Sequence, residues 1–252
     1  MHKIPAAAAK GPALSATPGR RPLPQRNNII RAAIGIGLYA GAFGATFGAL
    51  AVGVGLTVAQ AMTLSLVMFT GASQFAFIGI VTAGGSPFAA IPAALLLGVR
   101  NAFYGVPIST IVSPRGAAKL WTAHLVIDET TALAVAQDTP PARRYAFWTM
   151  GVILFTLWNG GTLAGAVLGA AVDAEAFGLD AAAPAVLLAL LWPQLKTPGA
   201  PLVALLGAGV AVALIPVAPA GVPVIAAAVV AVAAGLGSGG SGGGRDDDVA
   251  PS

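Results

Sequence analysis

The stretch IIRAAIGIGLYAGAFGATFGALAVG, residues 29–53, decides the fold class of this chain. Arg31 is its one charged residue, and a helix of about 20 apolar residues is long enough to cross the hydrocarbon core of a bilayer. Gly37, Gly41 and Gly44 lie on roughly one face of such a helix, and Gly48 follows Gly44 by four residues. Small residues at this spacing let two membrane helices approach closely, so the stretch predicts a membrane helix packed tightly against others.

The composition of the whole chain indicates a membrane protein. Of its 252 residues, 57% are hydrophobic and 9% are charged, whereas about a quarter of the residues in a soluble domain are charged. The absence of cysteine excludes disulfides, thiolate metal sites and cysteine nucleophiles. Two histidines are too few for a histidine-only metal cage, so neither a metal nor another cofactor is expected. The basic residues cluster near the N-terminus, which for such a chain indicates membrane topology and not nucleic-acid binding.

Apolar segments follow one another along most of the chain. They cover residues 29–53, 57–83, 86–112, 119–137, 144–172, 183–195, 200–217 and 221–236. They predict an all-α, polytopic transmembrane helical bundle of about seven or eight spans, because 183–195 is short enough to be re-entrant. The predicted domain organisation is a disordered basic cytoplasmic arm (1–28), a transmembrane domain (29–236) and a flexible Gly/Ser/Asp tail (237–252).

The Lys and Arg residues predict the orientation. With eight spans and a cytoplasmic N-terminus, the outer side holds Arg115 and Lys119, together with an acidic loop. The inner side holds all the others except Arg100, namely Lys3, Lys10, Arg20, Arg21, Arg26, Arg31, Arg143, Arg144, Lys196 and Arg245. This distribution obeys the positive-inside rule and predicts a multi-pass protein of the bacterial inner membrane. If 183–195 does not span, the C-terminus moves to the outer side.

Two of the segments are longer than a straight span requires and contain helix breakers. Gly71 lies near the centre of 57–83, and Gly98, Gly105 and Pro107 lie within 86–112. Transporters form binding sites at broken helices, because unwound backbone exposes N–H and C=O groups to a substrate. A tilted or kinked helix without a ligand is an equally good interpretation of a single such segment.

Apart from tyrosines and residues near the ends of the segments, four ionisable residues lie within the predicted spans. Arg100 is in the third, and His124, Asp128 and Glu129 are in the fourth, where His124 and Asp128 would share a helix face. A charge at bilayer depth costs a few kcal/mol, so Arg100 is predicted to pair with Asp128 or Glu129. Either the pair fixes the register of two helices, or it belongs to a substrate or proton site in which the spare carboxylate carries a proton.

Uncharged polar residues accompany the predicted breaks. Ser73 and Gln74 follow Gly71, while Asn101 and Tyr104 follow Gly98, with Tyr104 one turn from Arg100. All four are candidates for substrate binding. For Gln74 the alternative is an interhelical hydrogen bond, which is common in membrane bundles.

The order and spacing of these features resemble the AzlC-type family, the large permease subunit of bacterial branched-chain amino acid exporters. The stretches that carry the resemblance are Phe43-Gly44 to Gly48, FTGASQF (69–75), RNAFYG (100–105), DET (128–130) and Gly178-Leu179-Asp180 with Pro184-Ala185. The resemblance covers roughly residues 30–195. It implies export of valine, leucine, isoleucine or related molecules, with a small AzlD-type membrane subunit as partner. Gly98 and Asn101 stand where the family's arginine motif usually has asparagine and histidine, which would alter specificity if those positions contact substrate.

The sequence therefore predicts a secondary transporter for branched-chain or related small apolar amino acids, coupled to protons through the spare carboxylate. Its expected partners are the amino acid, the lipid bilayer and the small subunit; a homo-oligomer is also compatible. A non-transporting scaffold is one alternative. An intramembrane hydrolase is another, but it would need Ser73 near His124, and GASQF lacks the second glycine of the G-x-S-x-G motif. No enzyme is expected.

Overall fold

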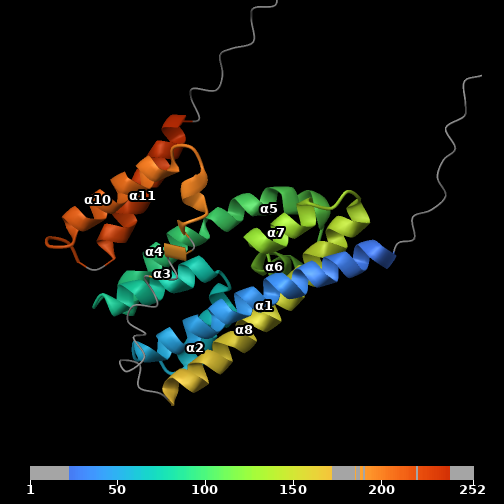
Figure 1. Ribbon diagram of the computed structural model, residues 1–252, viewed down its shortest axis with the longest axis horizontal. Helices are drawn as coiled ribbons and strands as arrows, with labels where there is room; N and C mark the ends of the chain where they lie inside the picture. The colour runs from blue at the N-terminus through green and yellow to red at the C-terminus, as the bar shows by residue number, and fades with distance from the viewer. Residues whose placement is uncertain (1–22, 172–184, 186–187, 190, 220, 239–252) are drawn as a thin grey trace, which may run out of the picture.

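The computed structural model describes residues 23–171, 185, 188–189, 191–219 and 221–238 (Figure 1). Every regular element within these ranges is helical, which confirms the predicted all-α class. The elements are α1 (Leu23–Gly53), α2 (Val58–Met68), α3 (Gly71–Thr82), α4 (Pro87–Gly98), α5 (Arg100–Ile111), α6 (Ala118–His124), α7 (Asp128–Val135), α8 (Pro140–Ala170), the 3-10 turn η2 (Gln194–Lys196), α10 (Ala200–Leu214) and α11 (Val222–Ser238). Three stretches in the described part are long and apolar enough to cross a membrane: Gln25–Gly53, Pro87–Ile111 and Pro140–Ala170.

The boundaries differ from the predicted ones at several points. Helix α1 begins at Leu23, inside the predicted arm 1–28. Residues 1–22, the stretch 172–184, residues 186, 187 and 190 within the predicted segment 183–195, and the tail from 239 lie outside the described residues. Helices α10 and α11 correspond to the predicted segments 200–217 and 221–236 and pack against each other.

Helices α1 and α8 form the central pair and lie side by side along their whole length (Figure 1). They run in the same direction. Gly41, Gly44 and Gly48 of α1 contact, in that order, Leu157, Trp158 and Thr162 of α8. A methyl group on Gly161 would overlap the carbonyl oxygen of Gly41, and one on Gly48 would overlap that of Thr162. The glycines predicted to allow close packing therefore do so, with backbone against backbone.

The chain reverses between α2 and α3. Phe69, with a φ of 22°, and Thr70 separate the two helices, close to the predicted break at Gly71. The Gln74 side chain donates to the Leu64 carbonyl oxygen over 3.3 Å, whereas a continuous helix would separate these residues by about 15 Å. Residues 57–83 therefore fold back on themselves. Each of the two helices is about 17 Å long, shorter than the ~30 Å hydrocarbon core.

A second interruption, which the sequence analysis did not predict, divides the segment 119–137. Residues 125–127 separate α6 from α7. The Thr130 hydroxyl holds this turn: it donates to the Leu125 carbonyl at 2.7 Å and accepts the Ile127 N–H at 3.1 Å. His124 and Asp128 therefore belong to different helices, and the predicted shared helix face is wrong.

Helices α4 and α5 continue almost without a break. Val99 alone separates them and keeps helical dihedrals, with φ −56° and ψ −30°. Gly105 and Pro107 lie inside α5, so the break predicted there is wrong. Proline is tolerated in a membrane helix because neighbouring groups can satisfy the freed backbone. Gly98 marks a local turn and not a gap.

The reversals change the predicted orientation of two basic residues. Helix α5 runs toward the end of the molecule where α1 and α8 begin (Figure 1). The short helices α6 and α7 return to that end, where Arg143 Nε donates to the Gln137 carbonyl at 2.7 Å. Arg115 and Lys119 therefore lie at the same end as Arg143, contrary to the prediction that placed them on opposite sides. The prediction failed because residues 57–83 reverse where a crossing was assumed.

Candidate functional site

A cavity of about 270 Å³ lies where the two reversals face each other. Its volume is slightly below the ~300–1,000 Å³ typical of sites for drug-sized ligands, so it suits a smaller solute. Its apolar wall consists of Tyr39, Phe43, Phe69, Phe75, Leu154 and Trp158. Its polar wall consists of Arg100, Asp128, Glu129, Gln194 and the backbone around Thr70.

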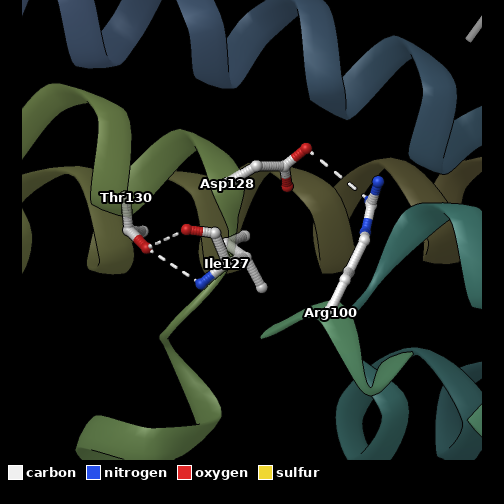
Figure 2. Close-up of polar contacts among 4 residues, drawn as sticks. All are labelled: Arg100, Ile127, Asp128 and Thr130. Carbon is white, nitrogen blue, oxygen red and sulfur yellow. Dashed lines mark hydrogen bonds and ion pairs between the residues drawn. The ribbon is translucent and has the colours of Figure 1, made fainter. Parts of the chain in front are cut away.

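Arg100 and Asp128 face each other at this cavity (Figure 2). The distance from Arg100 Nη2 to Asp128 Oδ2 is 3.6 Å, and the two side chains remain 43% and 47% exposed. A charge-assisted hydrogen bond would be about 2.7–2.9 Å long, so this contact is a loose ion pair. Both charged groups therefore keep hydrogen-bonding capacity for a third group.

The three residues of the DET sequence at 128–130 point in different directions. Asp128 faces Arg100, and Glu129 also lines the cavity. The carboxyl group of Glu129 lies beside that of Asp128. Thr130 points the other way and fixes the start of α7 through its bonds to the turn (Figure 2). A turn held in this way positions the two carboxylates at the amino end of α7, where negative charge is favourable.

The amino end of α3 also meets the cavity. Thr70 precedes the helix but makes no side-chain capping hydrogen bond, and Gly71 and Ala72 line the cavity. The first N–H groups of a helix lack intrahelical partners and carry partial positive charge. The cavity therefore has a positive region, formed by Arg100 and the start of α3, beside a negative region at Asp128 and Glu129.

With this geometry established, comparison with known proteins identifies the family. The sequence matches the family model described as "AzlC protein" over residues 35–172, more than half of the chain. The chain belongs to the AzlC family. A curated relative from Helicobacter pylori, described as an uncharacterized membrane protein, is 25% identical over 155 residues, which cover 61% of this chain and 68% of that relative. No solved structure matches the chain.

Family membership makes this a membrane protein with a role in transport; the AzlC family is a transporter family and not an enzyme family. The three helices of membrane-spanning length agree with that assignment. Membrane localisation is thereby supported, and the match covers the helices α2 to α8 and most of α1, which form the cavity's charged wall and most of its apolar wall.

The four uncharged candidates do not line the cavity of this AzlC-family protein. Ser73 and Gln74 are fully buried; Ser73 Oγ and Gln74 Oε1 have no hydrogen-bond partner among the described residues. The hydrogen bond from Gln74 on α3 to Leu64 on α2 joins two helices, which is the alternative given above for Gln74. Asn101 and Tyr104 are partly buried on α5. Substrate contact by these four side chains stays a prediction.

His124 lies at the meeting point of the two reversals. Its ring is 5.6 Å from that of Phe69 and 5.9 Å from that of Phe155, measured between centroids. The backbone of Leu66, near the end of α2, also lies beside its imidazole. His124 therefore links the tip of the α6–α7 pair to the tip of the α2–α3 pair. No cluster of three or more His, Cys, Asp or Glu side chains that could hold a metal occurs in the described part of the chain.

The aromatic wall of the cavity was not predicted from the sequence. A methyl group on Gly71 would lie 2.8 Å from the Trp158 ring, so glycine at this position lets the indole close the cavity against α3. Trp158 Nε1 is buried without a partner in the described residues. The one sequence feature that pointed to this wall is the glycine-rich face of α1. It predicts a closely packed partner helix but does not identify that helix as α8.

Proposed function

We propose that this AzlC-family protein exports branched-chain or related small apolar amino acids across the cytoplasmic membrane. One observation carries the proposal: a small cavity combines a cation, two carboxylates and an apolar wall. A zwitterion with an apolar side chain needs these three features and no others. The outward direction is supported by the resemblance to exporters.

The charged groups would hold the two ends of the amino acid. Arg100 and the free N–H groups at the start of α3 suit the substrate carboxylate. Asp128 suits the ammonium group. Because the ion pair is loose at 3.6 Å, each partner can bind one end of the zwitterion without breaking a short hydrogen bond. Leu154 and Trp158 would then contact the branched side chain.

Glu129 is the proposed proton carrier. Asp128 is already beside Arg100, so Glu129 is the carboxyl group without a cation within salt-bridge distance among the described residues, and it is the one that a proton would neutralise. Loss of that proton would add a negative charge to the cavity and strengthen its hold on the ammonium group. Uptake of a proton from one side would favour release of the amino acid, which couples the two movements.

A small AzlD-type membrane subunit is the proposed partner. Its support is the family resemblance and a stripe of exposed apolar side chains on the α4–α5 helix, which includes Phe88, Leu95 and Phe103. If this chain alone transports at the full rate in liposomes, the two-subunit proposal is wrong.

The alternatives have weaker support. A scaffold needs no charged cavity, although it would tolerate one. A hydrolase needs Ser73 hydrogen-bonded to His124, but Ser73 Oγ is buried without a hydrogen-bond partner in the described residues.

The deciding experiment is counterflow of labelled leucine in proteoliposomes that contain both subunits. The parent should exchange leucine, valine and isoleucine, and an imposed pH gradient should drive net movement. Arg100→Gln should abolish exchange, while Arg115→Gln, outside the cavity, should retain it. Absence of exchange by the parent with all three amino acids would refute the proposed substrate class. Exchange that ignores the pH gradient would refute proton coupling alone.

A further inference from the structure

Gly71 at the start of α3 and Trp158 on α8 lie far apart in the chain but meet at one wall of the cavity. A methyl group on Gly71 would lie 2.8 Å from Cη2 of the indole, 3.4 Å from Cζ3 and 3.5 Å from Cζ2. These three atoms form the outer edge of the six-membered ring. The indole edge therefore occupies the place that a side chain at position 71 would take.

The backbone and the ring of Trp158 are both held by close neighbours. A methyl group on Gly44 would lie 2.5 Å from the Trp158 carbonyl oxygen, so α1 lies directly against the backbone that carries the indole. Phe75, one turn after Gly71 on α3, is fully buried and packs edge-on against the indole, with 6.5 Å between the ring centroids. Phe47 of α1 supports Phe75 in turn, at 6.0 Å. A larger side chain at position 71 would therefore meet a ring whose backbone has little freedom to move.

The cavity is the space into which the ring can turn. Trp158 is only 8% exposed, and it lines the cavity. Non-bonded carbons rest about 3.5–4.0 Å apart, so a methyl group on Gly71 would force Cη2 to move by about 0.7 Å or more. Because Phe75 already packs against the ring from α3, the displaced edge would narrow the apolar part of the cavity.

We propose that the contact between Gly71 and Trp158 sets the largest side chain that the cavity accepts. The inference rests on the proposed function, since it places an amino acid side chain against the aromatic wall. The cavity of about 270 Å³ must hold both charged ends of the zwitterion as well as this side chain. Valine, leucine and isoleucine fit in front of the indole edge, whereas the indole excludes aromatic amino acids. Gly71 and Trp158 are thus specificity-determining residues of the site.

A substitution at position 71 can have two effects, and substrate selectivity separates them. The N–H groups at the start of α3 are proposed to hold the substrate carboxylate, which every amino acid has. Damage to that interaction would weaken the binding of all substrates by the same factor. A displaced indole would instead weaken large side chains more than small ones, because one methylene group changes discrimination in an apolar pocket by about 10- to 200-fold.

The test is competition by unlabelled alanine, valine, leucine and phenylalanine against counterflow of labelled valine, in proteoliposomes that contain both subunits. Gly71→Ala should reduce the apparent affinity for leucine relative to valine by about tenfold. Trp158→Phe, whose smaller ring lacks the edge that meets position 71, should let phenylalanine compete about tenfold better than it does in the parent.

Two further variants show whether the effect passes through the indole. The double variant Gly71→Ala/Trp158→Phe should recover most of the parent's leucine-to-valine ratio, because the added methyl group no longer meets Cη2. Gly160→Ala is the matched control on α8, since its methyl group meets nothing within 4 Å, and it should keep the parent's order of amino acids.

Each other outcome overturns the inference. Equal loss with all four amino acids in Gly71→Ala would mean that the methyl group acts on the carboxylate and not on the side chain. A double variant that keeps the altered ratio would show that the indole does not transmit the effect. Should Gly71→Ala fail to fold, Trp158→Phe decides, because continued exclusion of phenylalanine contradicts the size limit. A parent that exchanges no branched-chain amino acid would refute the proposed function as well, whereas unchanged selectivity in the variants of an active parent refutes this inference alone.

Discussion

Neutralising Arg100 and Asp128, singly and together, tests whether their contact is a structural lock or part of a binding site. At the observed separation of 3.6 Å, two unit charges attract by about 1 kcal/mol in water and about 4–5 kcal/mol at an effective dielectric constant of 20. Both side chains are almost half exposed, so the contact lies between a surface pair and a fully buried one. We expect a coupling free energy of about 1–2 kcal/mol.

The assay is a double-mutant cycle with Arg100→Gln, Asp128→Asn and the double variant, measured by unfolding in one detergent or lipid. Each single variant should lose stability, and the double variant should recover part of that loss because no unpaired charge remains. Leucine counterflow should fall about tenfold or more in all three variants, since each lacks a group that holds the zwitterion. Recovery of folding without recovery of transport is the expected signature.

Two results would refute this reasoning. A coupling free energy below about 0.3 kcal/mol would mean that the two residues do not interact. A double variant that transports like the parent would show that the pair only fixes the register of α5 and α7. Arg115→Gln serves as the control for loss of a positive charge outside the cavity.

Three further predictions concern the scaffold. Gly161→Ala should destabilise the protein by about 1–3 kcal/mol in thermal or chemical unfolding, because its methyl group meets the backbone of α1; Gly160→Ala, which meets nothing within 4 Å, should be neutral or stabilising. Thr130→Val should cost about 1–3 kcal/mol and reduce counterflow by displacing the DET turn, whereas Thr131→Val, whose hydroxyl has no partner among the described residues, should cost little. Because the chain has no native cysteine, Ser113→Cys can be labelled selectively, and an impermeant thiol reagent should reach it from the same side as a cysteine in the amino-terminal arm. The predicted side is the cytoplasm; labelling of the two cysteines from opposite sides would contradict the fold.

The sequence by itself determined the class of the protein and was sufficient to select the charged residues of the candidate site. The sequence has few charges, many apolar segments and regularly spaced glycines. These features predict a membrane helical bundle, because a chain inside a bilayer must satisfy its own backbone hydrogen bonds and long apolar helices do so. Arg100 and the Asp128-Glu129 pair could be selected for the same reason: a charge is costly in hydrocarbon and needs a partner. The contact between Arg100 and Asp128 follows from that requirement.

The tertiary structure decided where the chain crosses and where it turns back. A reversal and a kink have similar local sequences, since both are made with Gly, Thr and small residues. The turn at residues 125–127 depends on the Thr130 hydroxyl, a side-chain bond that hydropathy does not record. The direction of α8 beside α1, and the closure of the cavity by Trp158 over Gly71, depend on contacts between residues far apart in the chain. Such contacts are set by how complete helices fit together, and no local pattern encodes them.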